Sequence, residues 1–118
     1  MKQRTKHFAV QVIKLTDTLP NRRASNIIAN QLIRSATSVG ANLRSALRAR
    51  SQADFISKIG ITTEEADESE YWMELLIEAD IAKTEQVAAP LKEANELVAI
   101  LTATSKTTQT PSTRYPKS

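Results

Sequence analysis

Cysteine is absent from the sequence and histidine occurs once, which excludes several kinds of site. Without cysteine, neither a disulfide framework nor a thiolate metal site can form, and nothing in the composition calls for an oxidising compartment. A di-iron site in a helical bundle needs Glu-x-x-His on two helices, which His7 alone cannot supply. Because a lone histidine near a chain terminus is ordinarily solvated, we expect neither a metal nor any other cofactor.

Glycine and proline are also scarce, with two and four residues respectively. Gly40 and Gly60 each lie within a helical pattern, so the sequence has no glycine-rich phosphate loop. His7 lacks both a cysteine nucleophile and an obvious second catalytic partner. We therefore expect a protein that is not an enzyme.

Long apolar runs are missing as well. The opening segment, MKQRTKHFAVQVIKL, has a basic start but no uninterrupted apolar stretch long enough for a signal peptide or a membrane span. A membrane-surface helix is disfavoured too, because the apolar face behind the arginines of the second helical segment is needed for a bundle core. These features predict a cytoplasmic protein that does not bind a membrane.

The sequence does contain apolar residues at helical spacing in four segments, without the alternation of a strand. The segments cover residues 8–19, 28–49, 52–80 and from 84 onward. Pro20 follows the first segment, and Ser51 with Asp54 resembles a capping box before the third. Gly40 lies inside the second segment and indicates a close helix contact, since an interior glycine costs about 1 kcal/mol relative to alanine.

These patterns predict an all-α protein. A chain of 118 residues with 41% hydrophobic and 25% charged residues is typical of one globular domain. Four amphipathic helices joined by short connections predict an antiparallel, up-down-up-down four-helix bundle over residues 1–104. Residues 105–118 are rich in Thr, Ser, Lys and Pro and are expected to form a disordered tail.

The net charge of +3 hides an asymmetry along the chain. Residues 1–58 contain eleven Lys or Arg and two acids, whereas residues 59–118 contain five bases and eleven acids. Two explanations stay open. The basic half either forms an anion-binding face, or the two halves neutralise each other within or between subunits.

Arginines of the second helical segment fall on the side away from its apolar face. At about 100° per residue, Arg34, Arg44 and Arg48 share this side, with the small Ala41 between them. The planar guanidinium fork suits phosphate or carboxylate. The alternatives are a contact with nucleic acid or an acidic partner, a solvated face, and ion pairs between subunits.

The third helical segment is apolar on two sides, which favours burial on two sides. The second apolar side predicts a subunit interface, for which aromatic residues and leucine are suitable anchors. The predicted interface residues are Ile61, Glu68, Tyr71, Trp72 and Leu75. The alternative is that Trp72 packs on the flank of the fourth helix. Acids along this segment could meet the arginines of a neighbouring copy, a heterologous contact that can close a ring.

The segment RSATSVGANLRSALRARSQADFISKIGITTEEADESEYWMELL resembles a bacterial four-helix bundle family named for proteins encoded in 23S rRNA intervening sequences. More weakly, the resemblance extends over about residues 8–101. The matching motif residues are Arg34, Ser35, Ala36, Ser38, Val39, Asn42, Arg48, Arg50, Ser51, Asp54, Phe55, Glu65, Ala66, Glu68, Tyr71, Trp72 and Leu75. Ser45 stands where many members have a glutamate, so this chain lacks that carboxylate beside its arginines.

The resemblance implies a ring-shaped homopentamer without a catalytic site. Family members are suspected of binding nucleic acid, and a related group resembles accessory subunits of diversity-generating retroelements, which bind a reverse transcriptase and its RNA. Our leading hypothesis is an RNA- or DNA-binding accessory protein that contacts phosphates through basic residues of its first two helices. These residues are Lys14, Arg22, Arg23, Arg34, Arg44, Arg48 and Arg50. The alternative is a protein-interaction scaffold without nucleic-acid affinity, with a reverse transcriptase as a candidate partner.

Overall fold

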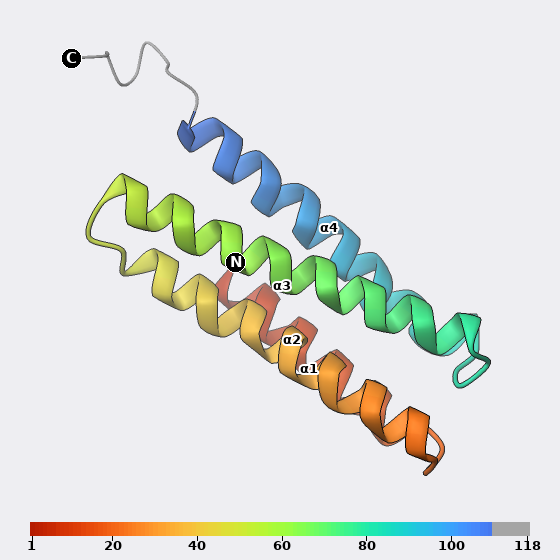
Figure 1. Cartoon of the computed structure of the whole chain (residues 1–118). Coiled ribbons are helices and arrows are strands. Elements are labelled where there is room, and N and C mark those ends of the chain that lie inside the picture. Colours follow the sequence, from red (N-terminus) through yellow and green to blue (C-terminus); the bar gives the residue numbers. More distant parts are fainter. Residues whose placement is uncertain (110–118) are drawn as a thin grey trace.

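A computed structural model describes residues 1–109 of the chain, and within this range four α-helices are present without a strand (Figure 1). The helices are α1 (Lys2–Asp17), α2 (Arg23–Leu47), α3 (Gln52–Glu78) and α4 (Thr84–Gln109). Short connections make each helix run antiparallel to the one before it (Figure 1). The prediction of an all-α four-helix bundle is therefore confirmed.

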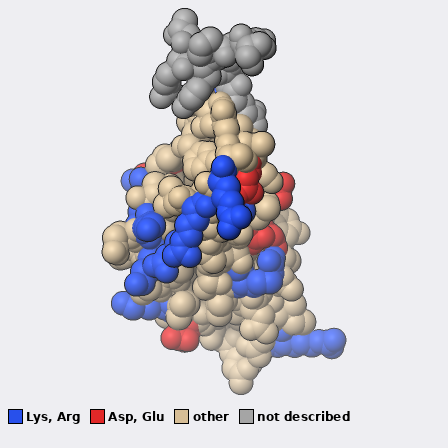
Figure 2. All heavy atoms as spheres, turned by 90° about the vertical axis from the view of Figure 1, so that its left-hand side faces the viewer, with Lys and Arg blue, Asp and Glu red and all other residues tan. Residues whose placement is uncertain are grey.

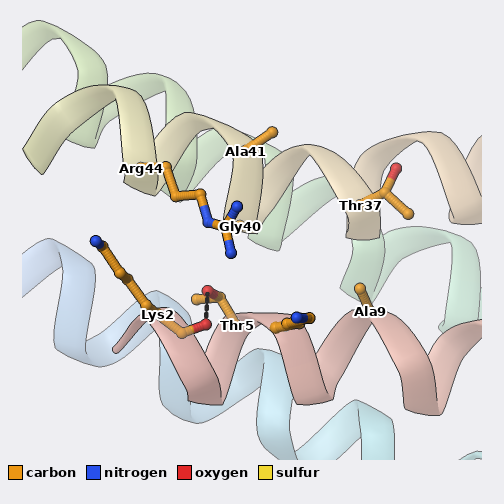
Figure 3. Close-up of a pocket in the computed structure, with 8 residues that line it drawn as sticks. Lys2, Thr5, Ala9, Thr37, Gly40, Ala41 and Arg44 are labelled. Carbon is orange, nitrogen blue, oxygen red and sulfur yellow. Dashed lines mark hydrogen bonds between the residues drawn. The ribbon is translucent and has the colours of Figure 1, made fainter. Parts of the chain in front are cut away.

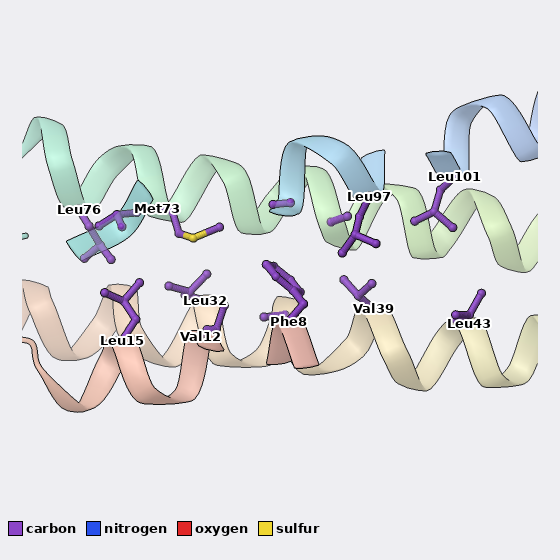
Figure 4. Packing of buried hydrophobic residues seen from close by; sticks show 14 of the residues in the cluster. Phe8, Val12, Leu15, Leu32, Val39, Leu43, Met73, Leu76, Leu97 and Leu101 are labelled. Carbon is purple, nitrogen blue, oxygen red and sulfur yellow. The ribbon is translucent and has the colours of Figure 1, made fainter. Parts of the chain in front are cut away.

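The core is formed by the residues that recur at helical spacing in the sequence. Side chains from all four helices point into the space between them (Figure 4). The large core side chains that solvent does not reach are Phe8, Val12, Leu32, Val39, Met73, Leu76, Val87 and Leu97. Since burying one such side chain stabilises the fold by about 1.5–3 kcal/mol, this apolar contact holds the bundle together.

The helices pack unequally around this core. α2 contacts α3 most extensively and α3 contacts α4 nearly as much, whereas α1 lies against α2 and touches α4 less. A bidentate ion pair between α1 and α4 reinforces this weaker contact. Arg4 Nε and Nη2 donate to Glu93 at 2.7 and 2.9 Å, and Nη2 also donates to Glu96 at 3.0 Å. The basic helices α1 and α2 are thus neighbours, as are α3 and α4.

Two helix ends have clear local causes. Ser51 Oγ accepts the N–H of Asp54 at 3.0 Å, so the predicted cap at the start of α3 is confirmed. At the other end of α3, Asp80 adopts a positive φ of 57°, and Ile81 and Asp80 donate to the carbonyls of Leu76 and Ile77. This is a Schellman motif, which satisfies carbonyls that the helix itself leaves free.

The ends of all four helices differ from the sequence expectation. α1 ends at Asp17, α2 at Leu47 and α3 at Glu78, each slightly earlier than expected. α4 continues past Ser105 to Gln109, because the Thr104 and Thr108 hydroxyls donate to backbone carbonyls one turn back and Gln52 Nε2 donates to the Thr108 carbonyl. The rest of the expected tail, residues 110–118, lies outside the described residues.

Candidate nucleic-acid interface

Charge is divided between the helices as the sequence predicts. α2 contains no acidic residue, whereas α3 contains eight and a single lysine, Lys58. Figure 2 looks at the bundle from the left-hand side of Figure 1, where α2 turns into α3, and among the charged side chains on this face Lys and Arg cover more surface than Asp and Glu. The bundle therefore has a basic side on α1 and α2.

Arg34, one of the predicted phosphate contacts, forms ion pairs with acidic residues of the same chain. Its guanidinium binds Glu68 Oε1 through Nη2 and lies 3.4 Å from Glu65 Oε2 through Nη1, both on α3. Trp72 Nε1 donates to the same Glu68 oxygen at 3.3 Å. The sequence left open a contact between these acids and the arginines of a neighbouring copy. For Arg34, antiparallel packing of α2 on α3 places two acidic partners, Glu65 and Glu68, in the same chain.

The electrostatics of this cluster follow from its geometry. The hydrogen bond and the negative charge of Glu68 raise the pKa of the Arg34 guanidinium. Burial raises the pKa of the Glu65 carboxyl, and the nearby Arg34 opposes that increase. Arg34 is consequently a neutralised link between α2 and α3.

The other six predicted basic residues are exposed, and none forms an ion pair within residues 1–109. They do not form one cluster. Arg22 and Arg23 lie at the start of α2, whereas Arg44, Arg48 and Arg50 lie at its other end. A helix of 25 residues separates the two groups by about 35 Å. Lys14 lies on α1 in a hollow that faces α4.

Sequence reasoning missed a groove between α1 and α2. Lys2, Lys6 and Arg44 line it, together with Thr5, Ala9, Thr37, Gly40 and Ala41. Figure 3 shows Arg44 reaching from α2 toward α1 across Gly40, with Lys2 on the facing helix. The i, i+4 spacing of Lys2 and Lys6 could have indicated a shared face. The position of Arg44 opposite them depends on the helix packing and could not be read from spacing.

The predicted interface residues on α3 divide into two kinds. Ile61 and Tyr71 are exposed by 43% and 53%, so they belong to the surface of the bundle. Trp72 and Leu75 are half-buried, and Trp72 packs against the core with its ring edge-on to Tyr71 at 5.1 Å. An apolar strip is thus present on the outer face of α3, and Trp72 also contributes to the fold.

The described part of the chain contains no group of three His, Asp or Glu side chains arranged to hold a metal ion. No helix in residues 1–109 combines the length and apolar character of a membrane span.

Comparison with known proteins places the chain in a family. The family model described as 23S rRNA-intervening sequence protein matches residues 1–103. A crystal structure of a protein with unknown function from the S23 ribosomal protein family of Bacteroides thetaiotaomicron is 38% identical, with a TM-score of 0.82 over 89% of this chain and 97% of that one. No curated protein matches. The chain belongs to the 23S rRNA-intervening sequence protein family.

Proposed function

We propose that this protein is a non-catalytic homo-oligomer that binds RNA or DNA through the phosphate backbone. The observation that supports the proposal best is a set of exposed basic residues on α1 and near both ends of α2. None of them has an acidic partner in residues 1–109. Phosphate contacts from Lys and Arg release condensed counterions and give affinity without sequence preference. The contacts are Lys14, Arg22, Arg23, Arg44, Arg48 and Arg50.

Arg34 has a smaller part in this proposal than the sequence suggested. Its guanidinium is already bound by Glu68 and Glu65, so a phosphate would have to displace a carboxylate. The basic groups at the two ends of α2 are free to act separately. A nucleic acid lying along α2 would meet phosphate contacts at both ends, which suits a duplex or a structured RNA more than a single short strand.

The oligomer in this proposal is formed through the outer face of α3. Exposed Ile61 and Tyr71 with half-buried Leu75 offer apolar surface that a second copy would cover. The family resemblance implies five subunits arranged in a ring. Light scattering of the Ile61→Ser, Tyr71→Ser variant tests the interface, because both side chains lie outside the core. Val10→Ser, Ile13→Ser removes equally exposed apolar surface from α1 and is the matched control.

The alternative function is a protein-interaction scaffold with no nucleic-acid affinity, for which a reverse transcriptase is a candidate partner. The same apolar face of α3 favours it, since a protein partner could cover that face. In this case the free arginines would be used at subunit or partner contacts.

Charge reversal at Arg44 and Arg48 separates the two functions. We expect the double variant Arg44→Glu, Arg48→Glu to retain the mass of the oligomer. Its affinity for nucleic acid should fall at least tenfold. The control variant Lys83→Glu, Lys92→Glu carries the same change in charge on exposed residues of the other half of the chain. Its affinity for nucleic acid is expected to stay within about threefold of that of the unmodified protein. Dissociation of the oligomer by the Arg44, Arg48 variant would favour the scaffold.

A further inference from the structure

We propose that the groove between α1 and α2 is a binding site for a backbone phosphate of a nucleic acid, held by Lys2, Lys6 and Arg44. This inference rests on the proposed function and assigns to it a particular place on the surface. Two of the three residues, Lys2 and Lys6, were not among the basic residues that the sequence singled out. The phosphate would lie over Gly40, between the two helices.

Small residues make room for a ligand at this point. A Cβ atom on Gly40 would lie 3.4 Å from Thr5 Oγ1, within van der Waals contact, so α1 and α2 lie close together here. Around this contact, Ala9, Ala41 and Thr37 leave a groove of about 240 Å³. A water molecule in the liquid takes up about 30 Å³, so a phosphodiester group with some of its hydration fits.

The charge in the groove is of one sign. Three of its eight lining residues are cationic and none is acidic, and none of the three cations forms an ion pair within residues 1–109. The hollow between α3 and α4, by contrast, is lined by Glu64 and Asp67 as well as a lysine. Unpartnered cations that share a groove repel each other, and a bound anion would relieve that repulsion.

The start of α1 adds to the attraction. The first turn of α1 contains no acidic residue, and no side chain caps its N-terminus. Cations near a helix N-terminus are unfavourable because that end of the helix dipole is positive, and an anion there is favourable. Arg44 reaches the groove from the opposite helix, where its guanidinium fork can donate two hydrogen bonds to phosphate oxygens.

Ala41 offers a test that leaves all three cations in place. It is exposed and lines the groove, so a longer side chain there enters the groove and not the core. We expect Ala41→Glu to weaken binding of a labelled duplex DNA at least tenfold at low salt. Ala41→Gln, which has the same size without the charge, is expected to change the affinity less than threefold. Equal affinities for the two variants would overturn the proposal.

A second measurement identifies the source of the phosphate. In NMR titrations of the full chain, the duplex is expected to shift the backbone amides of Thr37, Gly40 and Ala41 at far lower concentration than inorganic phosphate does. If the unmodified protein binds the duplex without shifting these amides, the assignment of the groove as the phosphate-binding site is wrong and the proposed function stands. If neither the duplex nor a structured RNA binds, the proposed function fails. Amide shifts with inorganic phosphate alone would then assign the groove to a free anion and overturn the proposal.

Discussion

Arg34 of α2 and Trp72 of α3 bind the same atom, Oε1 of Glu68. From the sequence, Arg34 belongs to a basic face and Trp72 to an oligomer interface. The structure joins both to one carboxylate inside a single chain. Within residues 1–109, Arg34 therefore has a structural partner and Arg44 has none.

Arg34 and Arg44 should consequently differ in nucleic-acid binding. Because Glu65 and Glu68 neutralise Arg34, Arg34→Gln is expected to leave the dependence of log K on log salt unchanged. Arg44→Gln is expected to lower the slope by about 1, the contribution of one lost phosphate contact. Fluorescence anisotropy over a range of salt concentrations measures both slopes. An equal loss of slope in the two variants would show that Arg34 also contacts phosphate.

The buried Ser35 and Ser69 should be energetically coupled. Their Oγ atoms lie 2.9 Å apart across the α2–α3 contact, and each also lies within hydrogen-bond distance of a backbone carbonyl of its own helix. Each single change to alanine is expected to lower the free energy of unfolding by about 1 kcal/mol. The double variant should lose less than the sum, since both singles remove the same bond. Strictly additive losses in urea denaturation would contradict this coupling.

Glu70 should make the protein less stable at neutral pH. Burial first, and then the negative charges of Asp67 and Glu74, raise the pKa of its carboxyl in the folded chain. Between the ordinary and the raised pKa, the folded state binds more protons than the unfolded state, so the free energy of unfolding falls as pH rises through this window. Glu70→Gln is expected to raise stability at pH 7 by about 0.5 kcal/mol, the size of a like-charge pair on a helix.

The same variant should lose its advantage in acid. Below the ordinary pKa of glutamate, near 4.3, Glu70 is protonated in both states and the substitution removes no charge. Urea denaturation followed by circular dichroism at pH 7 and below pH 4 measures the difference. A gain in stability of the same size at both pH values would show that the charge of Glu70 is not its cause.

Asp80 is a site where glycine should stabilise the fold. Its φ of 57° lies in the left-handed region, which glycine adopts without the steric cost that a Cβ imposes. Asp80→Gly is expected to raise the free energy of unfolding by about 0.5 kcal/mol, and Asp80→Ala to lower it by a similar amount. Thermal unfolding ranks the three proteins. If the Asp80→Ala protein is as stable as the Asp80→Gly protein, the backbone at this position is not strained.

The bundle could be predicted because its core follows the helical period closely. Phe8, Val12, Leu32 and Val39 recur at helical spacing in the sequence and are all buried in the structure. Local rules also placed the cap at Ser51, since it depends only on residues of the same turn. The apolar pattern predicts an end of α4 that is too early, because the hydroxyl contacts of Thr104 and Thr108 outweigh the low apolar content there.

The arrangement of the candidate site could be predicted less well than the fold. Periodicity places Arg34 and Arg44 on the outer side of one helix. It does not tell which helix each side chain meets, because that depends on how α2 packs against its two neighbours. Arg34 meets the acids of α3, whereas Arg44 lies beside Lys2 of α1. The sequence therefore identified the basic residues but not their division between structural and free roles.

The measurement that tests the central claim most directly is a salt titration of the unmodified protein with a labelled structured RNA and a duplex DNA. For duplex DNA, log K falls with log salt by about 0.9 for each phosphate that the protein neutralises. We predict binding to both nucleic acids at low salt, with a slope for the duplex of about −3 or steeper as several basic residues act together. Absence of binding at low salt, or binding that does not weaken as salt rises, would contradict a phosphate-binding function.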